Sequence, residues 1–418
     1  MIKIIKAQDF SRDEIKTQAP DVSNIVSEII NNVKTHGDKA LFEYESKFDN
    51  VNLDSLEVTQ TEINDALNHV GKDFISLLER AATNIYNFHS KQVRNGFVFS
   101  DKEGVILGQR IIPLERVGLY VPGGTASYPS SVLMDSIPAK IAGCDEIYIA
   151  TPPEIKAEII AAAHVAGVNK IFKMGGAQAV AALAYGTESV PRVDKIVGPG
   201  NVFVAEAKRQ VFGRVAIDMI AGPSEILIIA DSNNNPAYIA ADMLAQSEHD
   251  KLASAMLITD SESFAKSVSN EIESQLPKLA RYEIARESIN NNGAIILVED
   301  LSRAVELANN IAPEHLEICT ENPFEWLMSG KIRNAGSVFL GKHSPEALGD
   351  YYAGPNHTLP TMGTARFSSP LSVDDFIKKS QYIYYTQQAL NEASYDIEKF
   401  ANSEGLTGHA NSAAIRRL

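Results

Sequence analysis

The chain has 418 residues and a formal net charge of −15 at pH 7, so its acidity argues against a nucleic-acid partner or an anionic membrane. Its length allows two or three domains, and its two cysteines exclude a disulfide framework. The N-terminus lacks the apolar run of a signal peptide, and no apolar stretch reaches membrane-spanning length. We therefore expect a cytoplasmic protein that binds neither nucleic acid nor a membrane.

Residues 1–115 are predicted to form an N-terminal strand followed by a helical region. The strand is expected at 1–7, and apolar residues recur at helical spacing over 21–48 and 61–92. This region holds no cluster of chemically active side chains, so we interpret it as scaffold or dimer surface.

From Arg116 onward, short apolar runs alternate with amphipathic helices, which is typical of a parallel sheet covered on both faces. Two such series follow one another, over 116–222 and 223–370, and they predict two similar α/β domains that face one cleft. The predicted strands span 117–121, 146–150, 170–174 and 195–197 in the first series, and 225–230, 254–259, 294–298, 317–320 and 337–340 in the second.

Ligands of open α/β sheets bind beyond the carboxyl ends of the strands. In the first series, glycine-containing turns are expected at that edge, at 122–124, 175–178 and 198–201. In the second series, the helix that carries Gln246 and His249 is expected there. No complete GxGxxG motif is present, so these turns are equally compatible with phosphate binding and with ordinary tight connections.

Gln246 and His249 are predicted to end a helix that begins near Pro236. Their spacing of three residues places them on one helical face, where an imidazole nitrogen and an amide oxygen suit zinc. The pair alone is weak evidence for a metal, because glutamine is an uncommon ligand and a histidine near a helix C-terminus often complements the helix dipole.

Glu314 and His315 form the second cluster, directly before a predicted strand. Imidazole titrates near neutral pH, and an adjacent carboxylate can orient it or activate water, so the pair suits general acid–base catalysis. The alternative is a solvated acidic turn.

The third cluster spans 343–357 and contains His343, Glu346, Asp350 and His357. Its glycines and prolines predict a loop rather than a helix. Loops that hold such residues on a rigid scaffold are commonly functional, and Asp350 is a plausible metal ligand.

Residues 371–418 are predicted to form a helical tail that starts near Ser372. The tail carries Glu404 and His409 in a glycine-flanked segment. It is too polar to hold a core of its own, so we expect it to pack on another surface, such as a partner chain.

Eight longer motifs, taken together, resemble the histidinol dehydrogenase family. They occur in unbroken order from about residue 20 to the C-terminus. The motifs are GLYVPGG (118–124), GGAQAVAALAYGTE (175–188), VGPGNVFVAEAKRQV (197–211), IDMIAGPSEILIIAD (217–231), AQSEHD (245–250), APEHLE (312–317), LGDYYAGPNHTLPT (348–361) and EGLTGHANS (404–412).

The resemblance implies a zinc-dependent homodimer with two incomplete Rossmann-like domains, which oxidises L-histidinol to L-histidine in two NAD-dependent steps at the end of histidine biosynthesis. It implies one zinc ion per subunit, bound by Gln246, His249 and Asp350 and by a His409 donated across the interface. It implies that Glu314 and His315 are the acid–base residues, that Tyr120, Gln178 and Asn201 contact NAD, and that Ser224, His315, His357, Glu404 and the metal ligands contact the substrate. Glu346 is placed near the site.

The chemistry agrees with this resemblance, because histidinol offers an imidazole and an amine to the metal. His315 would take the alcohol proton, and Glu314 would activate the water that hydrates the aldehyde. Three alternatives remain open: a related dehydrogenase of another small alcohol, a zinc hydrolase, and a non-catalytic binding module that would leave the acid–base pair unexplained. Formation of NADH from histidinol distinguishes them.

Overall fold

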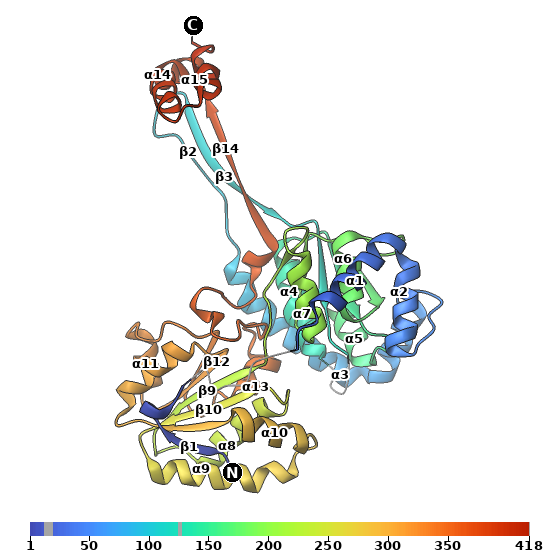
Figure 1. The fold of residues 1–418 in the computed structure, drawn as a ribbon, viewed down its shortest axis with the longest axis vertical. Helices are drawn as coiled ribbons and strands as arrows, with labels where there is room; N and C mark the ends of the chain where they lie inside the picture. The colour runs from blue at the N-terminus through green and yellow to red at the C-terminus, as the bar shows by residue number, and fades with distance from the viewer. Residues whose placement is uncertain (12–19, 124–127, 418) are drawn as a thin grey trace. The chain divides into compact units, whose positions relative to one another are not determined.

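The computed structural model describes residues 1–11, 20–123 and 128–417, which form two compact units (Figure 1). The main unit contains Met1–Gln92 and Glu115–Phe376, and the second unit contains Val93–Leu114 and Ile377–Leu418. Across the described residues, no helix is both long and apolar enough to cross a membrane. The finer division of the chain at residues 115, 222 and 370 stays a prediction.

The first sheet of the main unit is parallel throughout and has the strand order β6-β5-β4-β7-β8. The first four of its strands in chain order confirm the strands predicted for the first series. The strands are β4 (Arg116–Tyr120), β5 (Glu146–Thr151), β6 (Lys170–Lys173), β7 (Lys195–Val197) and β8 (Ala216–Ile217).

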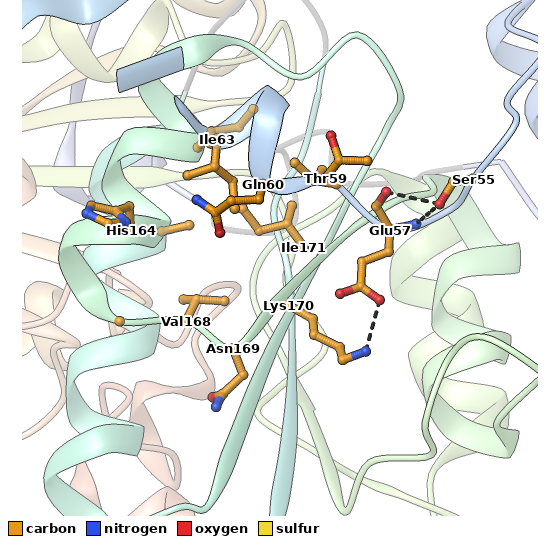
Figure 2. A pocket seen from close by; sticks show the side chains of 14 residues that line it. Ser55, Glu57, Thr59, Gln60, Ile63, His164, Val168, Asn169, Lys170 and Ile171 are labelled. Carbon is orange, nitrogen blue, oxygen red and sulfur yellow. Dashed lines mark hydrogen bonds and ion pairs between the residues drawn. The ribbon is translucent and has the colours of Figure 1, made fainter. Parts of the chain in front are cut away.

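One face of this sheet is covered by α4 (Pro129–Ala142) and α5 (Ala157–Ala166), on which α3 (Gln60–His89) packs. A hollow of about 690 Å³ opens between α3, α5 and β6 (Figure 2). Its polar lining includes the ion pair between Lys170 and Glu57, whose Nζ and Oε2 lie 2.9 Å apart. Both side chains of this pair are substantially exposed, so the hollow is an open surface feature.

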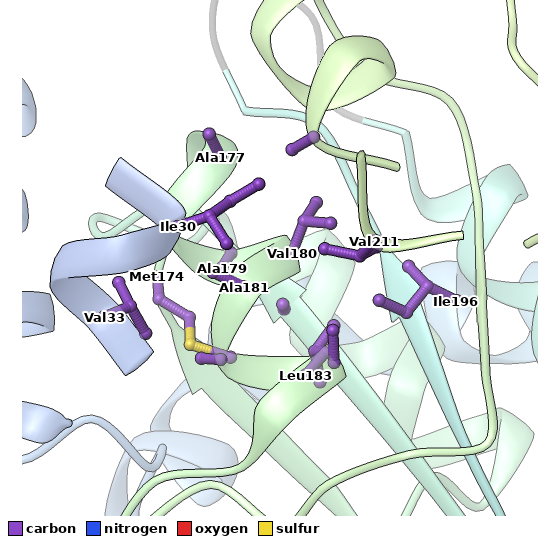
Figure 3. Packing of buried hydrophobic residues seen from close by; sticks show 14 of the residues in the cluster. Ile30, Val33, Met174, Ala177, Ala179, Val180, Ala181, Leu183, Ile196 and Val211 are labelled. Atoms are coloured by element: carbon purple, nitrogen blue, oxygen red, sulfur yellow. The ribbon is translucent and has the colours of Figure 1, made fainter. Parts of the chain in front are cut away.

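The other face is covered by α1 (Ser23–His36), α2 (Asp38–Tyr44), α6 (Gly176–Tyr185) and α7 (Val202–Val211). Alanines dominate α6, and their small side chains let Ile30 and Val33 of α1 pack closely against it (Figure 3). The predicted helices over 21–48 and 61–92 are therefore confirmed as α1, α2 and α3, and part of this N-terminal region covers the first sheet.

The second sheet of the main unit is also parallel, with the order β1-β11-β10-β9-β12-β13. The predicted N-terminal strand is confirmed as β1, which pairs with β11 at the edge of this sheet. The strands are β1 (Lys3–Lys6), β9 (Glu225–Ala230), β10 (Ser254–Thr259), β11 (Ala294–Leu297), β12 (His315–Cys319) and β13 (Ser337–Leu340).

Successive side chains of β9 alternate between two separate cores, as a strand buried on both faces requires. Ile226 and Ile228 join the core that includes helices α8 to α10, whereas Leu227 and Ile229 join the core that includes α11. The helices are α8 (Pro236–Ser247), α9 (Glu262–Gln275), α10 (Tyr282–Asn292), α11 (Leu301–Ile311) and α12 (Pro323–Met328).

The second unit corrects the prediction of a wholly helical tail over 371–418. The first long element of this tail is a strand, β14 (Ile377–Tyr385). It pairs antiparallel with β3 (Val105–Pro113), which in turn pairs with β2 (Phe97–Phe99). Most of β14 is exposed on both faces, so it lacks the alternation that reveals a half-buried strand. The helical prediction holds for the rest of the tail, which forms α14 (Gln387–Ser403) and α15 (Thr407–Ala414).

The prediction of a loop over 343–357 is wrong in its middle. The short helix α13 (Glu346–Leu348) continues into a π-helical turn, Gly349–Ala353. Pro345 adopts an extended conformation just before the helix, and Gly354 ends the turn with a φ of 112°. Proline and glycine therefore bound this helical segment instead of preventing it.

Candidate active site and metal centre

Most of the predicted chemistry of the second series lies at the amino edge of its sheet, not at the expected carboxyl edge. His315 is the first residue of β12, and Glu225 is the first residue of the neighbouring β9. Helix α8 leaves the carboxyl end of β9 and runs back, so that Gln246 and His249 at its end reach the same amino edge. The general rule for open sheets therefore fails for this sheet.

The connection between the two sheets gives the physical reason. The short segment 218–224 runs from the carboxyl end of β8 directly to the amino end of β9. Because a short segment cannot span a sheet and return, it brings the carboxyl edge of the first sheet near the amino edge of the second. A site between the sheets consequently uses opposite strand ends in its two halves.

Three side chains converge as a candidate metal site. The ligand atoms of His249, Glu346 and Asp350 all lie within 4.8 Å of one another. Glu346 opens α13 and Asp350 follows four residues later in the π-helical turn, so both carboxyls point to one side of the same helical segment. This placement brings Glu346 into the site, although the sequence motifs left its role uncertain.

The electrostatics of these three residues fit a divalent cation. Burial raises the pKa of Glu346 well above its usual range and that of Asp350 to about 7. Two buried carboxyls beside an imidazole are costly to ionise without a compensating positive charge, and a bound metal supplies one. Nitrogen and oxygen donors at this separation suit zinc.

Gln246 lies directly beside this triad and is only 1% exposed. One terminal atom of its amide lies 2.7 Å from Oε1 of Glu346 and 3.2 Å from Nδ1 of His315. An amide nitrogen there donates a hydrogen bond to Glu346, whereas rotation of the amide by 180° turns its oxygen toward the triad. Gln246 therefore lies within reach of the triad, and its place among the metal ligands stays a prediction.

His315 presents an unpaired ring nitrogen to this centre. Its Nδ1 lies 3.1 Å from the carbonyl oxygen of Glu225, so Nδ1 carries the proton and donates it. Its Nε2 is buried, has no hydrogen-bond partner among the residues that the structure describes, and lies 3.8 Å from Oδ1 of Asp350. Burial lowers the pKa of His315 to about 3, so the ring is neutral at pH 7 with its lone pair on Nε2.

Glu314 is held on the other side of His315. Its Oε2 accepts a hydrogen bond from the backbone amide of Glu225 at 2.9 Å and lies 3.8 Å from Nδ1 of His315. Burial raises the pKa of Glu314 well above its usual range. Glu314 is 6% exposed and His315 is 4% exposed, so the alternative of a solvated acidic turn is wrong. Buried groups with shifted pKa values in a cleft are typical of catalytic residues.

A cavity of about 250 Å³ adjoins this pair and is lined in part by His315, Phe339, Asp350 and His357. His357 is fixed on both ring nitrogens, with Nδ1 3.1 Å from the carbonyl oxygen of Asp350 and Nε2 3.1 Å from Oγ of Ser131. Ser131 was not predicted, because a serine in the first turn of a helix is an ordinary sequence feature.

The loop around His357 connects this cavity to α4, the helix that packs on the first sheet. Thr358 donates a hydrogen bond to the buried carboxyl of Asp135 at 2.7 Å, and Asn356 donates to the carbonyl of Met134 at 2.6 Å. Asp135 also lies beneath Gly198, where a Cβ atom would come within 3.3 Å of its Oδ2. One helix, α4, thus contacts both the His357 loop and the turn after β7.

The three predicted cofactor residues lie at the carboxyl edge of the first sheet, as expected. Tyr120 ends β4, and its hydroxyl accepts a hydrogen bond from the amide of Gly176 at 3.0 Å. Gln178 lies in the first turn of α6, and Asn201 caps α7 by accepting from the amides of Phe203 and Val204. The side chain of Asn201 therefore satisfies amides that a phosphate would otherwise bind.

Comparison with known proteins agrees with this geometry. The sequence model of the family described as Histidinol dehydrogenase matches residues 12–417. The chain belongs to the histidinol dehydrogenase family. Members of this family are oxidoreductases of histidine biosynthesis that use zinc and NAD.

Curated relatives carry the same description along nearly their whole length. The histidinol dehydrogenase of Clostridium acetobutylicum is 56% identical over 95% of this chain and 92% of its own, and that of Listeria monocytogenes is 51% identical over 100% and 96%. A crystal structure of histidinol dehydrogenase from Elizabethkingia anophelis superposes with a TM-score of 0.92 at 38% identity, covering 99% of this chain and 98% of that one. An acetylating aldehyde dehydrogenase from Geobacillus thermoglucosidasius shares the fold alone, with a TM-score of 0.51 at 15% identity over 88% and 99% of the two chains.

The remaining predicted histidinol dehydrogenase residues lie outside the buried cluster. Ser224 immediately precedes β9. His343, for which the sequence predicts no role, is exposed on the turn after β13. Glu404 follows the last residue of α14, His409 lies in α15, and both are exposed on the second unit. Their roles, like those of the other site residues, stay predictions.

Proposed function

We propose that this member of the histidinol dehydrogenase family oxidises L-histidinol to L-histidine at the cluster around His315. The observation that carries the proposal is the unpaired Nε2 of His315 beside the triad of His249, Glu346 and Asp350. A candidate metal site next to a neutral, proton-accepting imidazole suits the oxidation of an alcohol, because the imidazole can take the hydroxyl proton.

Gln246, His249 and Asp350 would hold the zinc ion in this proposal, with His409 of the partner subunit as a further ligand. When bound, zinc would supply a fixed positive charge that orients the imidazole and amine of histidinol. The donor set fits this role because it combines the imidazole nitrogen of His249 with the buried carboxyl of Asp350, which otherwise lacks a compensating charge.

The first oxidation uses the lone pair of His315. The alcohol carbon loses a hydride to the nicotinamide of NAD, and the hydroxyl loses its proton to Nε2 of His315. The products are the aldehyde, NADH and a protonated imidazole, so charge and atoms balance. The backbone carbonyl of Glu225 fixes the ring during this transfer by accepting from Nδ1.

The second oxidation needs water, because the aldehyde can lose a hydride only as its gem-diol. Glu314 lies beside His315 and can take the proton of that water once its own carboxyl is ionised. The water oxygen adds to the aldehyde carbon, and protonated His315 returns its proton to the resulting alkoxide, which gives the diol and restores the neutral imidazole. The diol then loses a hydride to a second NAD and a proton to Nε2 of His315, which leaves the carboxylic acid. The protons held by Glu314 and His315 then pass to solvent. Two NADH are formed for each histidinol.

The remaining predicted residues contact either NAD or the substrate in this proposal. Tyr120, Gln178 and Asn201 contact NAD in this proposal, since they share the carboxyl edge of the first sheet. Ser224, His357 and Glu404 contact the substrate together with the metal ligands, and Glu404 is contributed by the partner subunit.

Incubation of the purified protein with NAD and histidinol tests the proposed function. We expect two NADH per histidinol, loss of activity after treatment with a chelator, and recovery on addition of zinc. NADH from another small alcohol but not from histidinol would instead indicate a related dehydrogenase. Absence of NADH with either substrate would remove the oxidoreductase proposal.

A homodimer with shared sites makes a separate prediction. Mixing inactive His249→Asn protein with inactive His409→Asn protein should restore about a quarter of the wild-type activity, because half of the dimers are mixed and each has one intact site. Each variant mixed with itself is the control. Failure to recover activity despite measured subunit exchange would place His409 outside its partner's site.

A further inference from the structure

A buried acid, Glu45, lies near the carboxyl edge of the first sheet, beside the predicted NAD-contact residues, and has no role in the proposed chemistry. It begins the π-helical turn Glu45–Asp49, which continues directly from α2, and its side chain is fully buried. Its Oε1 accepts a hydrogen bond from Nε2 of Gln178 at 3.0 Å and from the amide of Gly175 at 3.3 Å. Glu45 is therefore bonded to one of the three predicted NAD-contact residues.

The same carboxyl also accepts a hydrogen bond from the backbone at the N-terminal end of α6. Gly175 occupies the N-cap position of this helix and has no side chain to satisfy the first amides. Glu45 accepts from the amide of Gly175, and the hydroxyl of Tyr120 accepts from the amide of Gly176. A dinucleotide often places its pyrophosphate at such a helix end, but here side chains of the protein already hold these two amides.

Three groups face Glu45 from the elements packed around it. Asp49 lies on the same turn, Tyr120 comes from β4, and Gln178 comes from α6. Burial is the main cause that raises the pKa of Glu45 to about 8, and the nearby Asp49 raises it further. At pH 7 the Glu45 carboxyl is consequently mostly neutral, so it holds Gln178 without placing a full negative charge beside the predicted NAD-contact residues.

We propose that Glu45 is a positioning residue for NAD, which sets cofactor affinity by holding Gln178 and the amide of Gly175. The inference rests on the proposed function, because it assumes that Tyr120, Gln178 and Asn201 contact NAD. We further infer that the N-terminal end of α6 binds the cofactor through the side chain of Gln178, which Glu45 holds in place, and not through free backbone amides.

A second consequence concerns pH. Ionisation of Glu45 above about pH 8 would add a negative charge beside the anionic cofactor, so KM for NAD should rise there in the wild type. Glutamine has the same shape as the neutral acid and cannot ionise. Glu45→Gln should therefore bind NAD as the wild type does at pH 7 and lack the rise at alkaline pH.

Steady-state kinetics of the zinc-loaded enzyme, with both substrates varied, test the proposal. Glu45→Ala is expected to raise KM for NAD by about tenfold while kcat and KM for histidinol change less than about twofold. Glu45→Asp, which is one methylene shorter, should fall between Glu45→Ala and the wild type. The matched control is Glu43→Gln, because Glu43 lies in α2 two residues away but is exposed and pairs only loosely with Lys39.

Besides an unchanged KM for NAD in Glu45→Ala, two results would overturn the positioning role. One is an equal rise in KM for both substrates in Glu45→Ala, which would indicate a general structural effect. The other is an alkaline rise in KM for NAD that persists unchanged in Glu45→Gln, and this second test stands even if Glu45→Ala does not fold. If the wild type itself forms no NADH from histidinol, the proposed function has failed; if it does and Glu45→Ala leaves KM for NAD unchanged, only this inference has failed.

Discussion

Replacement of His249 by Asn is expected to release zinc from the purified protein and to lower turnover at least about a hundredfold, because the proposed site would lose a direct metal ligand. His249 follows the last turn of α8 and is partly exposed, so the substitution leaves the two cores of the second sheet intact. Thermal unfolding of the variant should therefore stay cooperative.

Metal analysis of the purified variant, combined with its activity, measures this effect. His343→Asn is the matched control, since His343 is exposed on the turn after β13 and lies outside the triad. The control should keep both zinc and activity. Full zinc occupancy in His249→Asn would remove His249 from the ligands and leave Glu346 and Asp350 to be explained in another way.

Substitution of the acid–base pair is expected to separate the two oxidation steps. Glu314→Gln keeps the acceptor for the amide of Glu225 but removes the carboxylate, so it should slow oxidation of supplied histidinal by about a hundredfold or more. The first hydride transfer from histidinol should be slowed much less. His315→Asn should slow both steps by comparable factors, because each hydride loss also releases a hydroxyl proton.

Single-turnover formation of NADH from histidinol and from histidinal distinguishes these outcomes. Glu321→Gln serves as the control, because Glu321 is an exposed acid beyond the other end of β12. Equal slowing of both steps by Glu314→Gln would show that Glu314 and His315 act as one coupled unit. Unchanged rates in His315→Asn would remove Nε2 of His315 as the proton acceptor.

The amino-acid sequence alone was sufficient for the layered α/β architecture and for the family. Strands buried on both faces are largely apolar runs, and β9 and β10 begin and end where their predicted runs do. The three-residue spacing of Gln246 and His249 likewise predicts a shared face, because helical periodicity is a local property of the chain. The adjacency of Glu314 and His315 needs no folding at all.

Only the tertiary structure decided which strand ends carry the site. The short connection from β8 to β9 joins opposite edges of the two sheets, and the order of the predicted elements does not record which edges of the two sheets face each other. The prediction for residues 343–357 missed α13 and the π-helical turn, which bring Glu346 and Asp350 to His249, because it read the prolines and glycines as signs of a loop. The start of the tail was missed because β14 pairs with β3, far away in the chain.

Contacts between distant segments were equally invisible in the sequence. Glu45 is an unremarkable acid in a helical stretch until folding buries it against Gln178, and Ser131 resembles any helix-start serine until His357 reaches it. Burial then changes the chemistry of these groups, because the pKa of an acid or imidazole depends on the solvent and charges that folding removes or brings near. Residue type and spacing thus determined which chemistry was available, whereas long-range packing decided which of those residues meet and in which protonation state.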